Sequence, residues 1–372
     1  SILGGSEYLS RLLIANPSLF DSLVSPGSLD RTKNRKEMER EMRDLIASSS
    51  GWKDKLDIIR KFKRTETLRI GTRDLLDLSS GEALSSELTD LAEACLEVSL
   101  SYACEEASKV QGQLSPDVRF VLLGLGKLGE RELNYASDLD IIAVYSQEGM
   151  TSGGEKPFPL YFFFPAVVEK LLEALSRQTS EGSAYALDLR LRPLGEKGPL
   201  AHSIDSLVEY LCSSARPWER QAYTKARPVA GDIPFGIEVV ERIKEAIYSR
   251  PPEATDVHQM REKMIEELLS REPGSTNVKL SPGGIVDIEF IVQFLSLRRG
   301  KADTSVRKTG TLDAIDALSS KGYLKEEDSA ALRSAYEFFR RVEMRLRIVQ
   351  DLCLNALPSD PSALDDLGKR LG

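Results

Sequence analysis

Hydrophobic residues recur every three to four positions through the first 112 residues of the chain. The pattern covers six stretches: residues 8–14, 18–24, 35–48, 52–64, 67–78 and 86–109. This spacing is typical of amphipathic helices that bury one face. Pro17 and the Pro26-Gly27 pair are expected to interrupt the first two stretches. Region 1–112 is therefore predicted to be a helical scaffold whose role is packing.

Strand-like patterns appear in the middle region, 113–250. Two continuous apolar runs, 120–123 and 141–144, predict buried strands. Residues 184–191 alternate in polarity, which predicts a third strand with Asp188 on the face opposite the leucines. Helical spacing covers residues 160–180, 203–212 and 217–226. The middle region is thus expected to combine a small sheet with helices.

From residue 251 the pattern is helical again. Helices are expected over residues 260–269, 283–297, 312–318, 325–348 and 361–371. Such a series of helices favours a compact bundle for region 251–372. The predicted fold class is therefore α+β and predominantly helical, with the sheet-containing region between two helical ones.

The size and charge of the chain limit the classes of function. Its 372 residues are enough for two or three domains, and its formal net charge is −8. The acidic balance argues against bulk nucleic acid as a partner. No apolar run is long enough to cross a membrane and no signal-peptide pattern opens the chain, so a cytoplasmic location without a membrane partner is expected. The chain starts at Ser1 instead of methionine, which is compatible with a fragment of a longer protein.

Cysteine and histidine are scarce. The cysteines are Cys95, Cys104, Cys212 and Cys353. Because none has C-x-x-C spacing, they are expected to be buried free thiols of a cytoplasmic protein. Only His202 and His258 are present, which argues against a histidine-based catalytic site or a zinc centre.

Acidic residues mark the start of the second apolar run. Asp138 and Asp140 lie two positions apart, so a strand there places both carboxylates on one face, where they repel each other. A hard divalent cation, Mg²⁺ or alternatively Mn²⁺, would relieve that repulsion and bind substrate phosphates. With Asp188 as a third ligand, the three acids form a predicted metal and catalytic site for phosphoryl or nucleotidyl transfer. The alternative for Asp188 is a salt bridge to Arg190 or Arg192.

A glycine-rich turn follows the first apolar run. Gly124, Gly126 and Gly129 satisfy the G-x-G-x-x-G string of a dinucleotide fold, but residues 130–140 leave no room for the full helix that such a fold requires. Lys127 does not have the spacing of a P-loop lysine. The glycines are instead predicted to offer backbone N–H groups to phosphate oxygens.

Four cations are candidate partners for those phosphates: Lys127, Arg190, Arg192 and Lys225. Two of them have a simpler explanation. Lys127 is alternatively a solvated loop lysine, and Lys225 is alternatively part of a solvated helix face.

Several longer motifs follow one another in a characteristic order. They lie at residues 124–129, 132–140, 188–200, 218–227 and 283–290. Together they resemble the glutamine synthetase adenylyltransferase family, whose bifunctional members have two homologous halves. The resemblance covers essentially the whole chain. It implies a polymerase-β-like nucleotidyltransferase domain with a small mixed sheet, flanked by helical regions and a C-terminal helical bundle.

The resemblance also implies an activity. Asp138, Asp140 and Asp188 would be the metal ligands, and Ser137 with the glycine turn would hold the nucleotide phosphates. One family half transfers AMP from ATP to a tyrosine hydroxyl of glutamine synthetase, which regulates nitrogen assimilation. The other half removes the AMP by phosphorolysis and releases ADP. The regulatory PII protein and glutamine act on the full-length family enzyme.

The motifs do not agree on which half this chain is. Residues 132–134, 198–200 and 218–220 look more like the AMP-removing half, whereas 229–232, the short passage 248–262 and residues 285–288 look more like the adenylylating half. The short passage favours adenylylation. A non-catalytic regulatory module is a third interpretation, against which the three retained acids argue. Separately, Asp287 and Glu289 are expected to contact the nucleotide or to brace the active site. The alternative is a pair of acids stabilised by a helix N-terminus.

Overall fold

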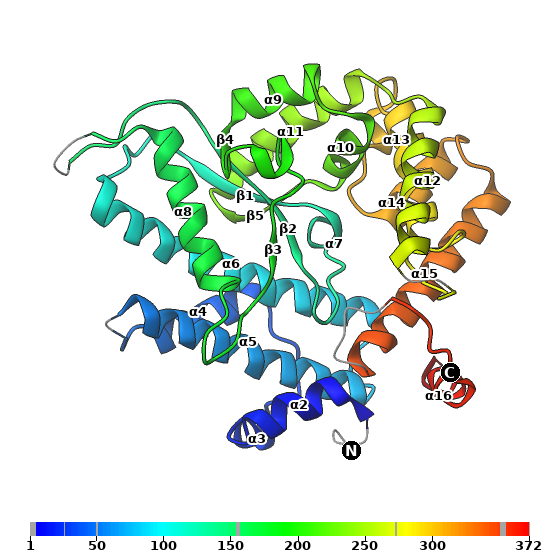
Figure 1. Cartoon of the computed structure of the whole chain (residues 1–372), viewed down its shortest axis with the longest axis horizontal. Helices are drawn as coiled ribbons and strands as arrows, with labels where there is room; N and C mark the ends of the chain where they lie inside the picture. The colour runs from blue at the N-terminus through cyan, green and yellow to red at the C-terminus, as the bar shows by residue number, and fades with distance from the viewer. Residues whose placement is uncertain are drawn as a thin grey trace.

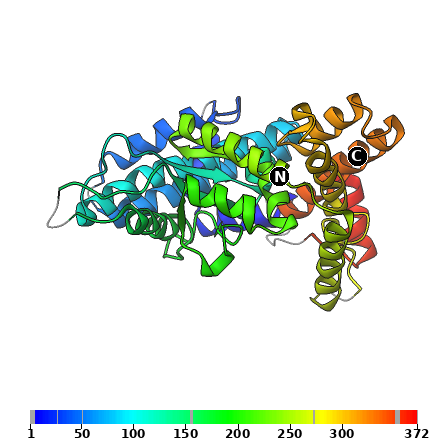
Figure 2. The ribbon, with the colours of Figure 1, turned by 90° about the horizontal axis from the view of Figure 1, so that it is seen from above.

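The computed structural model of the chain describes residues 5–25, 27–49, 51–153, 157–271, 274–349 and 355–371. A small sheet lies in the middle of the molecule, with the N-terminal helices along one side and the C-terminal helices at one end (Figure 1). Seen from above, the C-terminal helices form a stack beside the rest of the chain (Figure 2). The predicted α+β, predominantly helical class is confirmed.

Five N-terminal helices are described: α2 (Glu7–Ala15), α3 (Leu19–Val24), α4 (Arg35–Ile46), α5 (Trp52–Leu75) and α6 (Gly81–Gln111). The prediction of separate helices over 52–64 and 67–78 is wrong, because α5 runs through both. Thr65 and Thr67 donate their hydroxyl groups to the carbonyls of Lys61 and Lys63, one turn back along the helix. No proline or glycine lies between residues 64 and 67, so nothing ends the helix at the predicted break.

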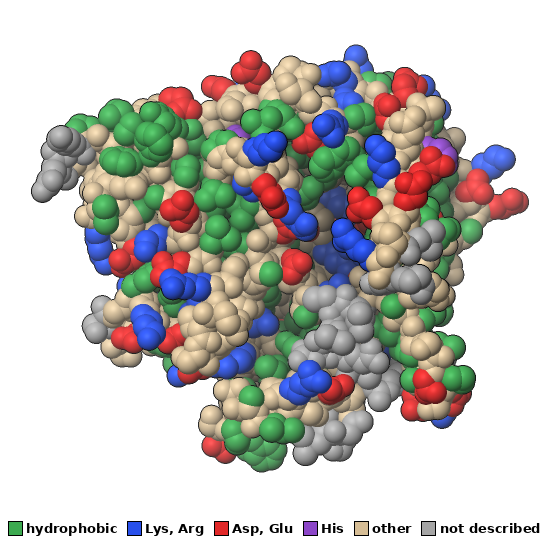
Figure 3. Space-filling model, in the orientation of Figure 1, with side chains coloured by type: hydrophobic (Ala, Val, Ile, Leu, Met, Phe, Trp, Pro, Cys, Tyr) green, Lys and Arg blue, Asp and Glu red, His purple; other side chains and the backbone are tan. Residues whose placement is uncertain are grey.

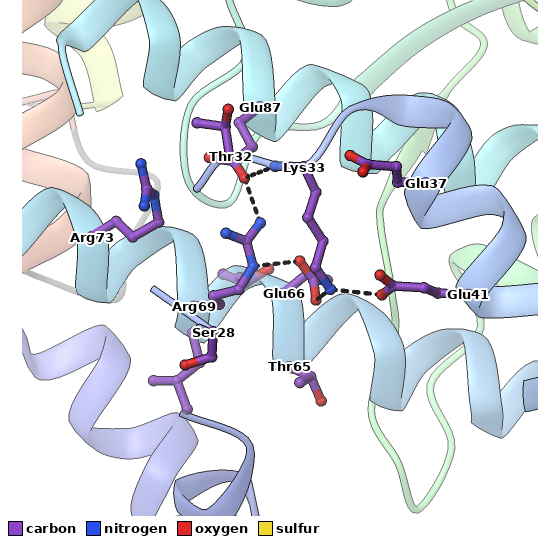
Figure 4. A network of polar contacts seen from close by, with 12 residues as sticks. Ser28, Thr32, Lys33, Glu37, Glu41, Thr65, Glu66, Arg69, Arg73 and Glu87 are labelled. Atoms are coloured by element: carbon purple, nitrogen blue, oxygen red, sulfur yellow. Dashed lines mark hydrogen bonds and ion pairs between the residues drawn. The ribbon is translucent and has the colours of Figure 1, made fainter. Parts of the chain in front are cut away.

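A network of buried charges joins α4, α5 and α6 (Figure 4). Lys33 Nζ lies 2.9 Å from Glu66 Oε1 and 2.6 Å from Glu41 Oε2. Arg69 Nε lies 2.7 Å from the other oxygen of Glu66, and its guanidinium also pairs with Glu87. The charges alternate in sign along the network, which offsets the cost of removing them from water.

Glu66→Gln is expected to lower the free energy of unfolding by about 2 kcal/mol, because it leaves Lys33 and Arg69 with one fewer carboxylate to bind. Urea unfolding measures this change. The matched control is Glu7→Gln, which removes an exposed pair with Arg11 and should cost about 0.5 kcal/mol or less. Equal effects of the two substitutions would show that the network does not contribute to stability.

Within the described residues the sheet has five strands: β1 (Phe120–Gly124), β2 (Leu139–Tyr145), β3 (Leu187–Asp188), β4 (Ala201–Ser203) and β5 (Arg227–Gly231). The order is β3-β2-β1-β5, and β4 also pairs with β2. Strand β1 is antiparallel to β2 and β5, whereas β2 is parallel to β3 and β4. The small mixed sheet implied by the family resemblance is thus present.

The predicted strand over 184–191 is wrong in length, because only Leu187–Asp188 pairs with β2. Just after that pair, the Asp188 carboxylate accepts the backbone N–H of Arg190 at 2.8 Å, and Arg192 N donates to Leu189 O at 3.1 Å. These local bonds compete with the sheet ladder and turn the chain away. Strands β4 and β5 were not predicted.

Helices cover both faces of the sheet. Helix α8 (Leu160–Leu175) lies with α6 on one face, and α9 (Ile204–Ser213) and α11 (Ile233–Ser249) lie on the other. The short helix α10 (Pro217–Ala222) follows α9. Alternate residues of β1 enter two different cores: Leu122 packs with α6 and α8, and Val121 and Leu123 pack with α9 and α11. Helix α8 ends before the predicted residue 180, and α11 was not predicted.

The C-terminal helices are α12 (Ala254–Arg271), α13 (Ile285–Arg299), α14 (Thr311–Ser320), α15 (Glu326–Val349) and α16 (Pro361–Leu371). Helices α13, α14 and α15 share a core of their own. Met344 and Ile348 of α15 belong instead to the core that joins the N-terminal helices to the sheet. The division at residues 112 and 250 stays a prediction, since one core crosses the first boundary.

Two predictions concern composition. Among the described residues no helix is long and apolar enough to cross a membrane. Cys95, Cys104 and Cys212 are free thiols, as predicted, but Cys212 is exposed because it lies on the solvent side of α9, and Cys104 is only half-buried. Cys353 lies outside the described residues.

Candidate functional site

The glycine turn lies against the start of β2. Because β1 and β2 are antiparallel neighbours, the turn after Gly124 meets the first residues of β2, and Leu125 N donates to Asp140 O at 2.9 Å. A short helix, α7 (Gly126–Glu130), follows. Gly126 has φ +49°, and a Cβ there would lie 2.6 Å from Asp140 Oδ2. Only glycine allows this approach of the carboxylate to the backbone.

Two of the three predicted acids are paired at this edge of the sheet, and the third lies just before it. Asp140 and Asp188 are directly paired residues of the parallel strands β2 and β3, and Asp138 is exposed just before β2. Paired residues of neighbouring strands share a face about 4.8 Å apart. Burial and the charges of Asp188 and Asp138 together raise the pKa of Asp140 to about 6, against the opposing charge of Lys279. The site therefore has an excess of negative charge around Asp140.

Asp188 also forms a salt bridge with Arg190, one of the two partners that the sequence suggested. Arg190 Nε lies 3.1 and 3.0 Å from the two carboxylate oxygens of Asp188. Burial raises the pKa of Asp188, but the hydrogen bonds from Arg190 and the charge of Arg192 outweigh burial and lower it. The Arg190 side chain is 71% exposed, so it is free to move away into solvent.

The described residues contain no group of three or more His, Cys, Asp or Glu side chains already arranged around one point as metal ligands. The donor chemistry of Asp140 and Asp188 nevertheless fits a hard divalent cation, because both offer carboxylate oxygens on adjacent strands and the charge of Asp188 makes Asp140 harder to ionise. The metal assignment of Asp138, Asp140 and Asp188 stays a prediction.

Lys127 and Ser137 flank this carboxylate edge and both contact α15. Lys127 Nζ forms an ion pair with Glu343, and its side chain is only 16% exposed, so the alternative of a solvated loop lysine is wrong. Burial lowers the pKa of Lys127 to about 7, against the opposing effect of Glu343. Ser137 Oγ accepts hydrogen bonds from Asn134 N at 3.1 Å and from Arg347 Nη1 at 3.3 Å.

Arg192 and Lys225 already have protein partners. Arg192 donates to the carbonyls of Gly198, Leu189 and Glu196 at 3.1, 2.8 and 3.1 Å and so holds its own loop together. Lys225 is 7% exposed, and the alternative of a solvated helix face is wrong. Nucleotide contact by either side chain stays a prediction.

The other two glycines of the turn are explained by packing. A Cβ on Gly124 would lie 2.7 and 2.8 Å from side-chain atoms of Leu128 and Val229, and one on Gly129 would lie 1.9 Å from Lys225 O. The N–H of Gly129 is bonded within α7, to Leu125 O at 2.9 Å. Phosphate binding by these two glycines stays a prediction, and the structure gives both a packing role.

The C-terminal helices add residues that the sequence did not single out. Lys279, between α12 and α13, is half-buried and close enough to influence the pKa values of Asp140 and Lys127. Glu343 and Arg347 of α15 contact Lys127 and Ser137. No local pattern identifies these three, since each meets the site across a large sequence separation.

Asp287 and Glu289, left open by the sequence, have different partners. Asp287 pairs with Arg261 and accepts the N–H of Gly283 at 2.5 Å, just ahead of α13. Glu289 pairs with Lys225 at 2.8 Å. Both acids thus brace the structure around the start of α13.

The chain is similar in sequence to two protein families. Residues 1–242 match the family model described as Glutamate-ammonia ligase adenylyltransferase, and residues 258–372 match one described as GlnD PII-uridylyltransferase. The chain is similar to proteins named bifunctional glutamine synthetase adenylyltransferase/adenylyl-removing enzyme. It is 33% identical to the one from Nitrosococcus oceani over 96% of the chain and 38% of that protein. It is 31% identical to the one from Hahella chejuensis over 99% of the chain and 39% of that protein. The chain therefore spans less than half the length of these relatives.

Proposed function

Because the chain belongs to the glutamate-ammonia ligase adenylyltransferase family, we propose that it is a nucleotidyltransferase that transfers AMP from ATP to a tyrosine hydroxyl of glutamine synthetase. The observation that carries the proposal is the pairing of Asp140 with Asp188 next to Gly126. This arrangement offers two carboxylates and a glycine turn at one edge of the sheet, which suits a nucleotide phosphate and its cation.

The reaction is an in-line displacement at the α-phosphorus of ATP. The tyrosine oxygen forms the new bond to phosphorus, the bond to the β-phosphate oxygen breaks, pyrophosphate leaves and the hydroxyl proton is released. Asp140 and Asp188, with Asp138, would hold Mg²⁺ or Mn²⁺. When bound, the cation neutralises phosphate charge and polarises the hydroxyl. Lys127, Ser137 and Arg190 would orient the phosphates, so the protein contributes positioning and electrostatics.

The direction of transfer is the second part of the proposal. Helix α11 ends at Ser249 and α12 begins at Ala254, so the two are joined by a short connection. The short connection supports the adenylylating half, as its sequence did. The alternative is the deadenylylating half, which would remove AMP from modified glutamine synthetase by phosphorolysis and release ADP. A non-catalytic regulatory module is the least supported, because it gives no reason for facing carboxylates.

Wider features of the proposal concern the longer protein. We propose ATP as the nucleotide substrate, a cytoplasmic location and a role in nitrogen metabolism, as expected for modification of glutamine synthetase. The match of residues 258–372 to a PII-uridylyltransferase model supports the regulatory PII protein as a partner of the longer protein. Region 113–250 is the proposed catalytic domain, with helical regions on both sides.

Incubation with unmodified glutamine synthetase, α-labelled ATP and Mg²⁺ tests the function. We expect label on a glutamine synthetase tyrosine, with none when the divalent cation is chelated. Modified glutamine synthetase with phosphate is the second arm, and ADP release there would assign the deadenylylating direction. Absence of both reactions with Mg²⁺ and with Mn²⁺ would contradict the proposed enzyme.

A further inference from the structure

One face of α15 is polar although the helix is packed against the rest of the molecule. Tyr336, Arg340, Glu343 and Arg347 are spaced by four, three and four residues, which places them on one side of the helix. All four contact the segment 126–137, which runs from α7 to the residue before Asp138. Figure 3 shows Lys and Arg side chains gathered in the hollow between the central part of the molecule and the C-terminal helices.

The first half of this face holds Glu132. Tyr336 donates its hydroxyl to Glu132 Oε2 at 2.7 Å, and Arg340 Nε lies 3.1 Å from the same oxygen. Arg340 also donates to the backbone carbonyl of Glu132. The chain just after α7 is therefore fixed by both its side chain and its backbone.

The second half holds the residues closest to the carboxylates. Glu343 is fully buried and pairs with both Lys127 and Arg340, and Arg347 Nη2 lies 3.7 Å from it. Arg347 Nη1 donates to Tyr135 O at 3.1 Å and to Ser137 Oγ at 3.3 Å. Burial raises the pKa of Glu343, but Lys127, Arg340 and Arg347 outweigh burial and keep it ionised.

These contacts matter because α7 cannot be rigid by itself. It has five residues, and a helix of that length is unstable unless tertiary contacts hold it. Helix α6 supports one end of the segment, where Arg131 pairs with Asp90. Among the described residues, Lys127 forms its ion pair with Glu343 of α15. The Ser137 hydroxyl accepts one hydrogen bond from α15 and one from Asn134 N.

We propose that Glu343 and Arg347 of α15 are positioning residues that hold Lys127 and Ser137 where the nucleotide phosphates bind, with Arg340 holding Glu343 in place. The inference rests on the proposed function and extends it, because the nucleotide site is then incomplete without a helix from the C-terminal region. These residues act through Lys127 and Ser137, and they are not required to touch the substrate.

The test is a double-mutant cycle on the KM for ATP. Glu343→Gln frees Lys127, so the KM for ATP should rise about tenfold or more, the size expected for losing one charged hydrogen bond. The kcat should change less, because the paired carboxylates remain. In the Lys127→Met background, Glu343→Gln should have little further effect, since the residue that it positions is absent. Glu343→Asp keeps the charge and should recover part of the loss.

Two further variants keep the test decisive. Arg333→Gln is the matched control on the same helix, since Arg333 pairs with Asp316 and Glu337 and not with segment 126–137, and it should leave the KM unchanged. If Glu343→Gln does not fold, as judged by circular dichroism, Arg347→Lys and Ser137→Ala form a second cycle in which the effects should again not add.

Specific outcomes would overturn the inference. If the wild type transfers AMP and folded Glu343→Gln has an unchanged KM, or if the effects of the paired substitutions simply add, α15 does not position these residues. If the wild type transfers no AMP in either direction, the proposed function fails. In that case binding of a fluorescent ATP analogue to the same variants still tests the positioning role. Weaker binding by Glu343→Gln than by the wild type, with unchanged binding by Arg333→Gln, supports the role. Equal binding by Glu343→Gln and the wild type refutes it.

Discussion

Asp140→Asn is expected to abolish AMP transfer while leaving the protein as stable as the wild type or more stable. Asparagine keeps the size of the side chain but removes the charge that would bind the divalent cation. We expect kcat to fall about 100-fold or more, as for the loss of a principal electrostatic group in other enzymes. The pairing of Asp140 with Asp188 is the reason, because losing one carboxylate leaves the cation with an incomplete set of ligands.

The stability change has a defined dependence on pH. The pKa of Asp140 is raised from 3.8 to about 6, so between these values the folded protein holds a proton that the unfolded chain has lost. Wild-type stability should therefore fall as the pH rises from about 4 to about 6. The asparagine variant cannot ionise at this position, so its stability should not fall in this way. Its free energy of unfolding should equal that of the wild type below pH 4 and exceed it by about 3 kcal/mol at most above pH 6, at about 1.4 kcal/mol per pKa unit.

Thermal unfolding without divalent cations, at pH 4 and pH 7, measures this difference. Adding Mg²⁺ should raise the melting temperature of the wild type and not of the variant. The matched control is Asp205→Asn, which removes an exposed carboxylate paired with Arg242 and should change neither activity nor the pH dependence. Full transfer activity in folded Asp140→Asn would show that the metal assignment is wrong.

Features carried by short stretches of sequence were predictable. The runs 120–123 and 141–144 are continuous, apolar and bounded by turn residues, and both are strands at the expected place. Asp140 could be placed on a strand edge from its position at the head of the second run. In each case the signal and the structure that it predicts lie within a few residues of each other.

Strand β5 shows why part of the sheet was missed. It begins with Arg227-Pro228, ends with Gly231 and pairs with β1 across a register shift. Proline and glycine weaken any strand signal, although both are tolerated at a sheet edge or bulge. By contrast, the start of α11 is marked in the sequence: Asp232 accepts the N–H of Phe235 at 2.9 Å as an N-cap, and Pro234 is compatible with the first turn.

The surroundings of the site could not be predicted from local sequence. Lys127 and Glu343 are 216 positions apart, and their pairing depends on how α15 packs against α7. Residue type gave no help either, because a lysine in a glycine-rich turn is usually solvated. Local sequence therefore predicted that Asp140 lies at the head of a strand, whereas the ion pair of Lys127 with Glu343 could be found only from the fold.

Lys225→Met is expected to be the most destabilising of the substitutions considered. Lys225 Nζ lies 2.7 Å from Glu130 and 2.8 Å from Glu289, and all three side chains are largely buried. Removing the ammonium group leaves two carboxylates facing each other without a cation. Breaking a buried pair in this way costs about 3–5 kcal/mol. Glu130 also accepts the N–H and the hydroxyl of Thr311, so the contact between α7 and α14 should weaken as well.

The loss should depend on pH. Burial, and the charges of Glu132 and Glu289, already raise the pKa of Glu130 to about 7 despite Lys225. Without the lysine the pKa of Glu130 should rise further. When the pKa of a carboxyl group is raised in the folded state, the free energy of unfolding falls as the pH rises. Urea unfolding should therefore show a larger deficit for Lys225→Met at pH 7.5 than at pH 5.5, and Glu289→Gln should restore part of it at pH 7.5.

The matched control is Lys369→Met. Lys369 also lies between two carboxylates, 2.7 Å from Asp365 and 3.4 Å from Asp366, but it is 68% exposed, so its loss should have little effect on stability. A folded Lys225→Met variant with unchanged stability and weaker ATP binding would contradict the bracing role. It would instead support Lys225 as a phosphate ligand, the role that its sequence motif predicted. The two roles thus differ in what they predict for unfolding, and that difference can be measured without the protein substrate.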